Sequence, residues 1–336
     1  MKQLTLLDEA PAENQSKGVA PAETDEALSA LAAGLDRRLR LGTSSWSFPG
    51  WAGLVYAAAG SKQVLSRDGL TAYSRHPLLR TVGVDSGFYA PLDSRRLARY
   101  AEQVPTDFRF LVKAPAAITD RFRRAAAGQI SEPNPGFLDL DLALKQAVTP
   151  FSEGLGERAG VLLFQFPPLG RDITDNPRRF AEDLYRFLRR LPKGPTYAVE
   201  LRDEALLTRD LAAALHHGGA VPGLAGHPRL PLLSAQGELF GGYDDGPLVI
   251  RWLLRRNRGY EEARDRYQPF DQLNEPDPRT RAGVTALVVA ALAEGREVFV
   301  IVNNKAEGSS PRSLIELARS LASEVKAMRQ RQCAAD

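Results

Sequence analysis

Charged side chains close several short apolar segments of this chain, and their types suit proton transfer. Asp85, Lys113 and Glu200 each stand at or near the end of a run of β-branched and aromatic residues. Partial burial and neighbouring charges can move the pKa values of such groups toward pH 7. A group with a pKa near the working pH can both donate and accept protons. We therefore predict that Lys113, Glu200 and Asp85 are catalytic. The structural alternative is ion pairing, of Lys113 with Glu200 or Asp85 and of Glu200 with Arg202.

Polar groups at other segment ends suit ligand binding. Arg202 and Arg251 carry paired N–H donors that match the oxygens of a carboxylate or a phosphate. Amide side chains both donate to and accept from ligand hydroxyls, and an asparagine pair that holds the loop backbone is the alternative. The ligand-binding residues predicted at segment ends are Thr43, Gln165, Arg202, Arg251, Asn303 and Asn304.

Four aromatic residues lie in the loops that follow the first two apolar segments. Trp46 and Trp51 fall in the large loop from Gly42 to Tyr56, and Phe88 and Tyr89 follow Asp85. Aromatic rings in such loops suit stacking on the face of a sugar or a base. We predict that all four bind ligand, and packing of the loops themselves is the alternative.

The segment NNKAEGSS, from Asn303 to Ser310, has the features of an anion-binding loop. An amphipathic helix is predicted to begin at Ser310, and a helix N-terminus offers free N–H groups with a partial positive charge. We predict that Lys305, Gly308 and Ser309 bind a phosphate group, with Arg251 nearby.

The apolar segments themselves predict the strands of a parallel sheet. They are short and β-branched, and helical patterns separate them, as expected for strands covered on both faces. Different polar residues at successive strand ends are typical of the C-terminal face of a (β/α)8 barrel. We therefore predict an α/β fold, a TIM barrel that forms one domain over residues 37–326. The eight predicted strands cover residues 38–43, 81–85, 108–113, 161–166, 196–202, 220–224, 248–252 and 298–304.

Helix start signals and two long connections complete this prediction. Asp93 and Asn176 precede amphipathic patterns and are suited to cap helices. The connection over residues 118–159 exceeds the usual length and predicts a lid or rim. The connection over residues 253–281 is also long, and it is rich in arginine and tyrosine.

Composition narrows the class of protein further. The chain has 336 residues, 43% of them hydrophobic, and a formal net charge of +3 that alone does not indicate nucleic acid. Cys333 is the only cysteine, which excludes an internal disulfide and a thiolate zinc site and favours a reducing, cytoplasmic location. No apolar run reaches the roughly 18 residues that span a bilayer. The four histidines lack metal-ligand spacing, so we expect no cofactor, although a magnesium ion on Asp85 and Glu200 stays open.

The two chain ends differ from the predicted barrel. Residues 1–36 are rich in Ala, Pro, Glu and Ser and predict a disordered leader, and residues 327–336 predict a polar tail. Within the leader, Gln3–Leu7 resembles the short peptides that dock on bacterial sliding clamps. A frayed N-terminus is the alternative interpretation of that apolar patch.

Six motifs, taken together and in order, resemble the YecE-like family, also called domain of unknown function 72. They are GTSSWSFPGW, VGVDSGFYAPL, FRFLVKAPAAITD, LLFQFPP, YAVELRDEALL and VIVNNKAEGSSP. The resemblance implies a TIM barrel related in shape to sugar isomerases and to endonuclease IV, without an established activity.

Departures from the family pattern bear on any role carried over from it. Asp85 stands where the family usually has Glu, Asp120 stands where it has His, and Glu204–Leu206 replace Pro-Ser-Trp. Two hypotheses of function remain open. One is a metal-independent isomerase, lyase or hydrolase that acts on a phosphorylated or sugar-like ligand at the C-terminal barrel mouth. The other is a nucleic-acid-binding protein linked to DNA maintenance.

Overall fold

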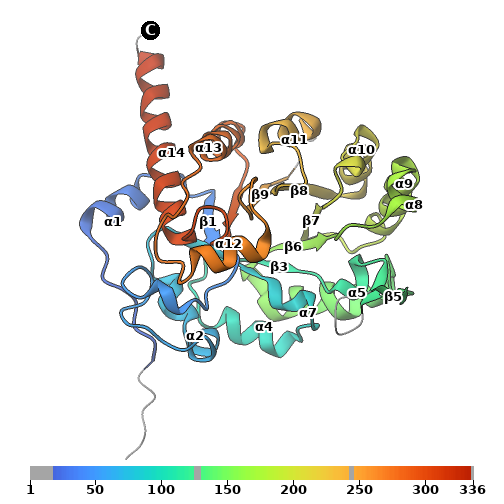
Figure 1. Cartoon of the computed structure of the whole chain (residues 1–336), viewed down its shortest axis with the longest axis horizontal. Helices are drawn as coiled ribbons and strands as arrows, with labels where there is room; N and C mark the ends of the chain where they lie inside the picture. Colours follow the sequence, from blue (N-terminus) through green and yellow to red (C-terminus); the bar gives the residue numbers. More distant parts are fainter. Residues whose placement is uncertain (1–17, 125–129, 242–245, 334–336) are drawn as a thin grey trace, which may run out of the picture.

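Eight parallel strands close into a barrel, and helices surround it (Figure 1). The computed structural model describes residues 18–124, 130–241 and 246–333. The strand order is β1-β10-β9-β8-β7-β6-β3-β2, which closes because β1 pairs with both β10 and β2. This arrangement confirms the predicted TIM barrel. The barrel strands are β1 Leu39–Thr43, β2 Leu79–Val84, β3 Arg109–Lys113, β6 Ala159–Gln165, β7 Thr196–Glu200, β8 Ala220–Gly226, β9 Leu248–Trp252 and β10 Val298–Val302.

The barrel interior is filled with side chains. Leu111, Val161, Leu163, Phe299 and Ile301 are among a buried cluster that is separate from the larger core between strands and helices. Successive residues of a strand point to opposite faces, so strands such as β3, β6 and β10 contribute side chains to both cores and are apolar along most of their length. These side chains close the barrel interior, so a ligand can bind only at the rim formed by the C-terminal ends of the strands.

The helices that cover the barrel begin where the sequence predicts them. Asp93 accepts a hydrogen bond of 2.7 Å from the Arg96 backbone N–H at the start of α4, and Asn176 accepts one from Arg179 at the start of α9. Both predicted helix starts are confirmed. The main outer helices are α2 Lys62–Asp68, α3 Leu70–Ser74, α4 Ser94–Ala101, α7 Thr149–Leu155, α9 Pro177–Leu188, α10 Arg209–Gly218, α11 Leu233–Phe240, α13 Pro278–Ala293 and α14 Ser310–Cys333.

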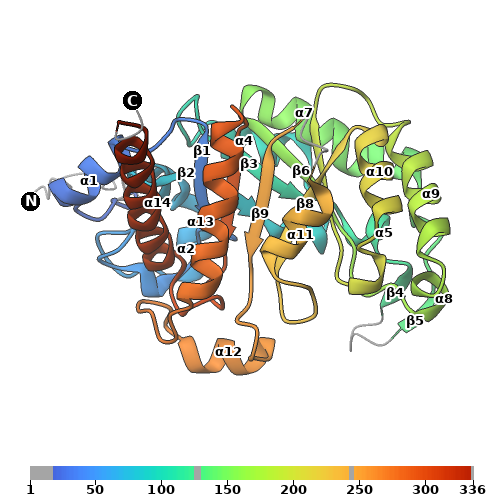
Figure 2. The ribbon, with the colours of Figure 1, turned by 90° about the horizontal axis from the view of Figure 1, so that it is seen from above.

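Shorter elements build the rim at the C-terminal ends of the strands. The connection after β3 forms a β4–β5 hairpin, and α12 follows β9 on the same side of the barrel (Figure 2). These rim elements enclose the mouth on two sides. Their bounds, with those of the other short elements, are η1 Pro49–Trp51, η2 Asp85–Phe88, α5 Ala116–Thr119, β4 Phe122–Arg124, β5 Ile130–Pro133, α6 Leu140–Ala143, η3 Leu144–Val148, η4 Gly156–Arg158, α8 Arg171–Thr174, η5 Glu204–Leu206 and α12 Tyr260–Tyr267.

Helices extend into the described parts of both predicted terminal regions. Within residues 1–36, the helix α1 Glu26–Ala33 lies beside α14 in both views (Figures 1 and 2). Leu28 and Leu31 are partly buried against the core, which gives this polar segment enough apolar contact to fold. Helix α14 continues to Cys333, past the boundary predicted at residue 326. The clamp-like peptide Gln3–Leu7 lies outside the described residues.

Membrane insertion finds no support in the described ranges, where no helix combines the length and apolarity needed to span a bilayer.

Gly42 provides a test of barrel packing, because β1 and β2 approach closely there. A Cβ atom at this position would overlap the Thr81 carbonyl oxygen, which belongs to the backbone and cannot rotate away. We predict that Gly42→Ala lowers the free energy of unfolding by about 3 kcal/mol or more. Urea unfolding followed by circular dichroism measures the loss.

Gly283→Ala is the matched control, since a Cβ atom in this α13 position meets nothing within 4 Å. It should raise stability by about 0.5–1 kcal/mol, as is usual for glycine in a helix interior. Equal stability of the two variants would contradict the packing described here.

Candidate functional site

Arg251 lies at the centre of a charged cluster at the C-terminal end of the barrel. Its side chain, on β9, is only 2% exposed. Its Nη2 atom donates to both carboxylate oxygens of Asp85 at 3.0 Å, and Nη1 donates to Glu200 Oε2 at 3.2 Å. Asp85 follows β2 and Glu200 ends β7, and neither strand is adjacent to β9. One guanidinium therefore ties together three separate strands across the mouth.

Glu200 is fully buried and holds two cations. Arg202 Nη2 lies 2.5 Å from its Oε1 atom, while Arg251 occupies Oε2. Burial opposes ionisation of this carboxyl, but the Arg202 and Arg251 charges outweigh burial and lower its pKa. Glu200 is therefore an ionised anchor for two arginines, and both of its oxygens are occupied.

Lys113 differs from the other charged residues of the cluster because it has no counterion in contact. Its Nζ atom lies 3.5 Å from the centroid of the Phe88 ring, and it forms no ion pair with a carboxylate of the described residues. Burial lowers the pKa of Lys113 to about 8, with Arg251 and Arg202 acting in the same direction and Asp85 and Glu200 opposing. Near physiological pH, Lys113 can therefore lose its proton and become a neutral amine.

The cluster carries an excess of positive charge. Three cations, Lys113, Arg202 and Arg251, face two carboxylates, Asp85 and Glu200. His227 lies close by, and burial together with Arg202 lowers the pKa of its imidazole to about 4, so it is neutral at pH 7. An excess positive charge in a partly desolvated mouth favours an anionic ligand.

Two clefts open beside this cluster. One, of about 370 Å³, is lined by Gln165, Arg202, His227 and Tyr260 among others. The second, of about 1000 Å³, lies between η2 and the connection after β3, and its lining includes Phe88, Tyr89, Asp120, Asn134 and Asp139. Pro167 lines both clefts, so they adjoin.

Exposed aromatic rings mark the two clefts. The side chain of Tyr89 is 87% exposed in one cleft, and that of Tyr260 is 58% exposed in the other. Phe88 contacts Tyr89 edge to face at 5.4 Å and lies under Lys113. The predicted stacking residues Phe88 and Tyr89 are therefore at the mouth, next to the charged cluster.

Three other predicted ligand residues are core residues instead. Trp51 is completely buried, and Trp46 is 5% exposed with its Nε1 atom donating to the Leu65 carbonyl. Thr43 is also completely buried and bonds to the hydroxyl of Tyr73. The loop after β1 packs on itself because its aromatic side chains can bury large apolar areas there. The sequence correctly identifies this loop as apolar, but these three side chains do not reach the mouth.

The N-terminus of α14 is occupied by the chain itself. Asn304 Oδ1 accepts hydrogen bonds from the Ser310 backbone N–H at 2.8 Å and from its hydroxyl at 2.7 Å. A Cβ atom on Gly308 would overlap the Gln272 carbonyl, so this glycine permits a close approach between two loops. Ser309 is completely buried, and its hydroxyl has no partner within the described ranges. These groups face protein, whereas Lys305 and Asn303 remain beside the mouth.

Lys305 and Asn303 lie between the end of β10 and α12. Lys305 Nζ is 4.2 Å from the centroid of the Tyr260 ring, and burial lowers the pKa of this lysine. The Asn303 carbonyl oxygen Oδ1 accepts from the Lys305 backbone N–H at 3.0 Å. Lys305 is thus, after Lys113, a second lysine of the rim that lies against an aromatic ring.

Tyr260 was not among the residues singled out from the sequence. It directly follows Gly259 at the start of a short helix inside the long connection after β9. An aromatic residue in an unusually long loop after a barrel strand is the signal that could have indicated it.

The arginines of that long connection are mostly engaged within the protein. Glu275 pairs with Arg258 at 2.7 Å and with Arg266 at 2.8 Å, and also accepts from the Tyr267 hydroxyl. The hydrogen bond from Arg258 is the main cause that lowers the pKa of Glu275 to about 2. Ion pairs within this loop therefore neutralise much of its positive charge, which leaves less of it for a ligand.

Metal binding finds no support in the part of the chain that the structure describes, where no group of three His, Cys, Asp or Glu residues is placed to hold an ion. Asp85 and Glu200, the pair considered for magnesium, instead bind the Arg251 guanidinium.

The fold and the mouth together define a TIM barrel with a charged, ligand-sized site at its C-terminal face. The family model "Protein of unknown function DUF72" matches residues 40–335. The chain belongs to this family, and the resemblance seen in its motifs is confirmed.

Two solved structures of family members have the same fold. A protein from Enterococcus faecalis is 17% identical with a TM-score of 0.56, and the match covers 84% of this chain and 95% of that one. A protein from Thermotoga maritima is 19% identical with a TM-score of 0.53, and the match covers 84% of this chain and 98% of that one. A search of curated proteins finds no match. At these identities the likeness concerns the fold alone.

The buried position of Glu200 predicts a large stability effect. Glu200→Gln removes the charge that neutralises Arg202 and Arg251, and should lower the free energy of unfolding by about 3 kcal/mol. The control is Glu204→Gln, an exposed glutamate in η5, which should change stability by less than about 0.5 kcal/mol. Urea denaturation of both variants checks this. Equal stability of the two would mean that Glu200 is not the anchor described here.

Lys113 gives stability an unusual pH dependence. Its folded pKa of about 8 lies below the ordinary lysine value of 10.5, so the unfolded chain binds more protons between these two pH values. The destabilising effect of the charged amine is complete below pH 8 and is relieved as pH rises through this window. The stability of the wild type relative to Lys113→Met should therefore increase between pH 7 and pH 9.5. Urea unfolding at both pH values measures it, and a constant or opposite difference would contradict the shift.

Proposed function

We propose that the protein is an enzyme that binds a small anionic, hydroxyl-bearing ligand at the barrel mouth and transfers protons through Lys113. The observation that carries this proposal is an unpaired, half-buried lysine beside two carboxylates that arginines already neutralise. A merely structural lysine in this place would be expected to pair with one of them. A group with a pKa near 8 is instead suited to general acid–base catalysis.

Arg202 is the best candidate for the anion contact. Its side chain is 15% exposed, lines the smaller cleft and is oriented by Glu200. Arg251 is more buried, and both of its Nη atoms already donate to carboxylates. The anionic group of the ligand would thus be bound next to Lys113, which places the reacting carbon and its protons close to the amine.

The lining of the larger cleft fits a ligand whose main part carries several hydroxyl groups. Asp120, Asn134 and Asp139 provide polar side chains along it, and Phe88 and Tyr89 provide aromatic faces. Aromatic faces with carboxylate and amide neighbours suit the two faces and the hydroxyl groups of a sugar. A sugar phosphate, or a sugar acid, fits both clefts better than a purely apolar compound.

The reaction class that fits is one that needs proton transfer. Isomerisation, elimination or hydrolysis can all proceed with an amine that accepts or donates a proton beside a bound anion. Glu200 would act as a positioning residue through Arg202, and Asp85 through Arg251, so Lys113 is the group that meets the substrate.

Nucleic-acid binding is the less supported alternative. The arginine-rich connection that suggested it holds Arg258 and Arg266 in ion pairs with Glu275. Any binding to duplex DNA should fall steeply with ionic strength, which separates it from binding in a cleft.

A ligand screen followed by one substitution tests the proposed enzyme. Thermal shift with inorganic phosphate, sugar phosphates, sugar acids and nucleoside monophosphates identifies compounds that stabilise the protein, and these are assayed for turnover. Lys113→Met should lower kcat at least 100-fold with ligand affinity changed less than about 5-fold, because proton transfer is lost while the anion contact remains. In the wild type the rate should rise with pH up to about 8 where the amine acts as a base.

Lys193→Met is the control, an exposed lysine before β7 that should leave both turnover and affinity unchanged. Turnover of Lys113→Met equal to that of Lys193→Met would overturn the assignment of Lys113.

A further inference from the structure

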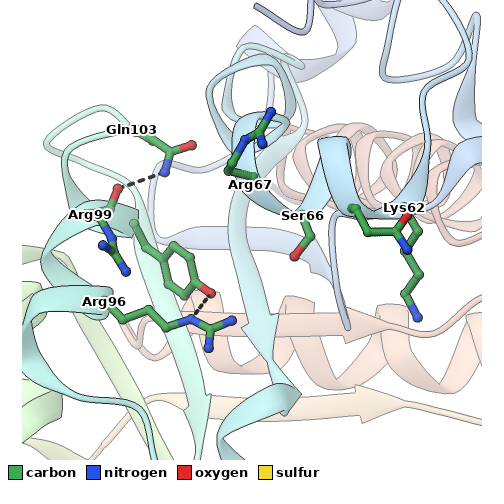
Figure 3. Close-up of a pocket in the computed structure, with 8 residues that line it drawn as sticks. Lys62, Ser66, Arg67, Arg96, Arg99 and Gln103 are labelled. Atoms are coloured by element: carbon green, nitrogen blue, oxygen red, sulfur yellow. Dashed lines mark hydrogen bonds between the residues drawn. The ribbon is translucent and has the colours of Figure 1, made fainter.

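A third cleft lies on the flank of the barrel, between α2 and α4 (Figure 3). It has a volume of about 840 Å³, within the roughly 300–1,000 Å³ of small-molecule sites. Helix α2 contributes Lys62 and Arg67, and α4 contributes Arg96 and Arg99. None of its lining residues lines either cleft at the mouth, so it is a separate place on the molecule.

Three of its four cations have no counterion in the part of the chain that the structure describes. Four cations line the cleft, and its lining contains no carboxylate. Arg67 pairs with its neighbour Asp68 at 2.8 Å. Lys62, Arg96 and Arg99 form no ion pair with any carboxylate that the structure describes. Like charges gathered in one cleft repel one another, and an anion bound there would remove this repulsion.

Several arginines elsewhere on the surface do have counterions. Arg186 on α9, Arg258 beside α12 and Arg319 on α14 all pair with carboxylates at 2.9 Å or less. The chain has 44 basic and 41 acidic residues, so counterions are not in short supply. The lack of a paired carboxylate at Lys62, Arg96 and Arg99 therefore reflects where these residues lie, and not a shortage of acidic residues in the chain.

Arg96 is held in position by the core. Its Nε atom donates to the Tyr100 hydroxyl at 2.9 Å, and its guanidinium lies 5.9 Å from the centroid of that ring. Tyr100 is itself only 7% exposed and packs edge to face on Trp46 at 5.1 Å. The Arg96 Nη atoms make no hydrogen bond within the described ranges, which leaves a fixed pair of donors for a ligand.

We propose that the α2–α4 cleft binds a small oligophosphate, an anion with at least two adjacent phosphate groups. Arginine guanidinium groups match phosphate oxygens through paired N–H donors. The cations stand on two facing helices, so one phosphate can be bound from each side (Figure 3). Ser66, Gln63 and Gln103 add neutral donors for the remaining oxygens. The lining is limited to residues of α2, of α4 and of the turn after α4, which favours a small molecule over a nucleic acid.

Isothermal titration with inorganic triphosphate tests this proposal. The double variant Arg96→Gln/Arg99→Gln should bind at least 10-fold more weakly than the wild type. The control is Arg95→Gln, a neighbouring exposed arginine on α4 that does not line the cleft, and it should bind within 2-fold of the wild type. No measurable binding to the wild type, or equal weakening in the double variant and the control, would overturn the proposal.

Two further measurements separate this cleft from folding defects and from the mouth. Arg99→Gln alone retains the bond between Arg96 and Tyr100, so it should keep the wild-type melting temperature and still weaken triphosphate binding. Lys113→Met, which changes the mouth, should bind triphosphate as the wild type does, and a loss there would move the site to the mouth and refute the proposal. Binding of a duplex oligonucleotide that depends on Arg96 and Arg99, without triphosphate binding, would refute it in favour of nucleic acid.

Discussion

The buried guanidinium of Arg251 connects the stability of the barrel to the chemistry of its mouth. Removing a guanidinium and a carboxylate from water costs several kcal/mol for each ion, and only good geometry offsets this cost. Arg251 meets this condition with two oxygens of Asp85 and one of Glu200, while Arg202 completes the shell of Glu200. Strands β2, β7 and β9 are thereby linked across the mouth at their C-terminal ends. Loss of Glu200 would leave the buried Arg202 and Arg251 without their shared counterion, so the contributions of these residues to stability are coupled.

The properties of Lys113 follow from the same arrangement. Both carboxylates near it are already bound by arginines, so its ammonium group meets a desolvated place without an ion pair of its own. Phe88 provides a ring face, which offers a weaker interaction than a carboxylate would. The result is a lysine with a lowered pKa that lies against Phe88, a residue lining the larger cleft. Rigid ion pairs thus surround one group that is free to change its charge, which is the division of roles expected of a preorganised site.

The sequence predicts the barrel and its rim well because both depend on local patterns. Short apolar runs specify parallel strands, and parallel strands in one barrel must end on the same side. Asp85, Lys113, Glu200 and Arg251 are therefore gathered correctly by topology alone. Which of them form ion pairs depends on the length and direction of each side chain. Arg251 on β9 reaches both Asp85 and Glu200, so Lys113 pairs with neither. No sequence pattern distinguishes that outcome from the pairing of Lys113 with Glu200.

Other features depend on contacts between distant segments and escape sequence reasoning for that reason. Trp46 and Trp51 have the composition of a binding loop, but they fill the core around α2 and β1. The N-terminus of α14 has the signals of a phosphate site, yet Asn304 caps it.

The α2–α4 cleft is a site that the sequence gives no sign of. Its cations are spread over 38 residues of sequence, from Lys62 to Arg99, and they form one site because the fold brings α2 and α4 to the same cleft. Charge that looks evenly distributed along this chain is thus uneven in space. Where Glu275 or Glu200 gathers arginines, the protein supplies the counterions, whereas in the α2–α4 cleft only Arg67 has one among the described residues. An external anion is the partner that would complete the electrostatics there, by the same physical requirement that Glu200 meets inside the barrel.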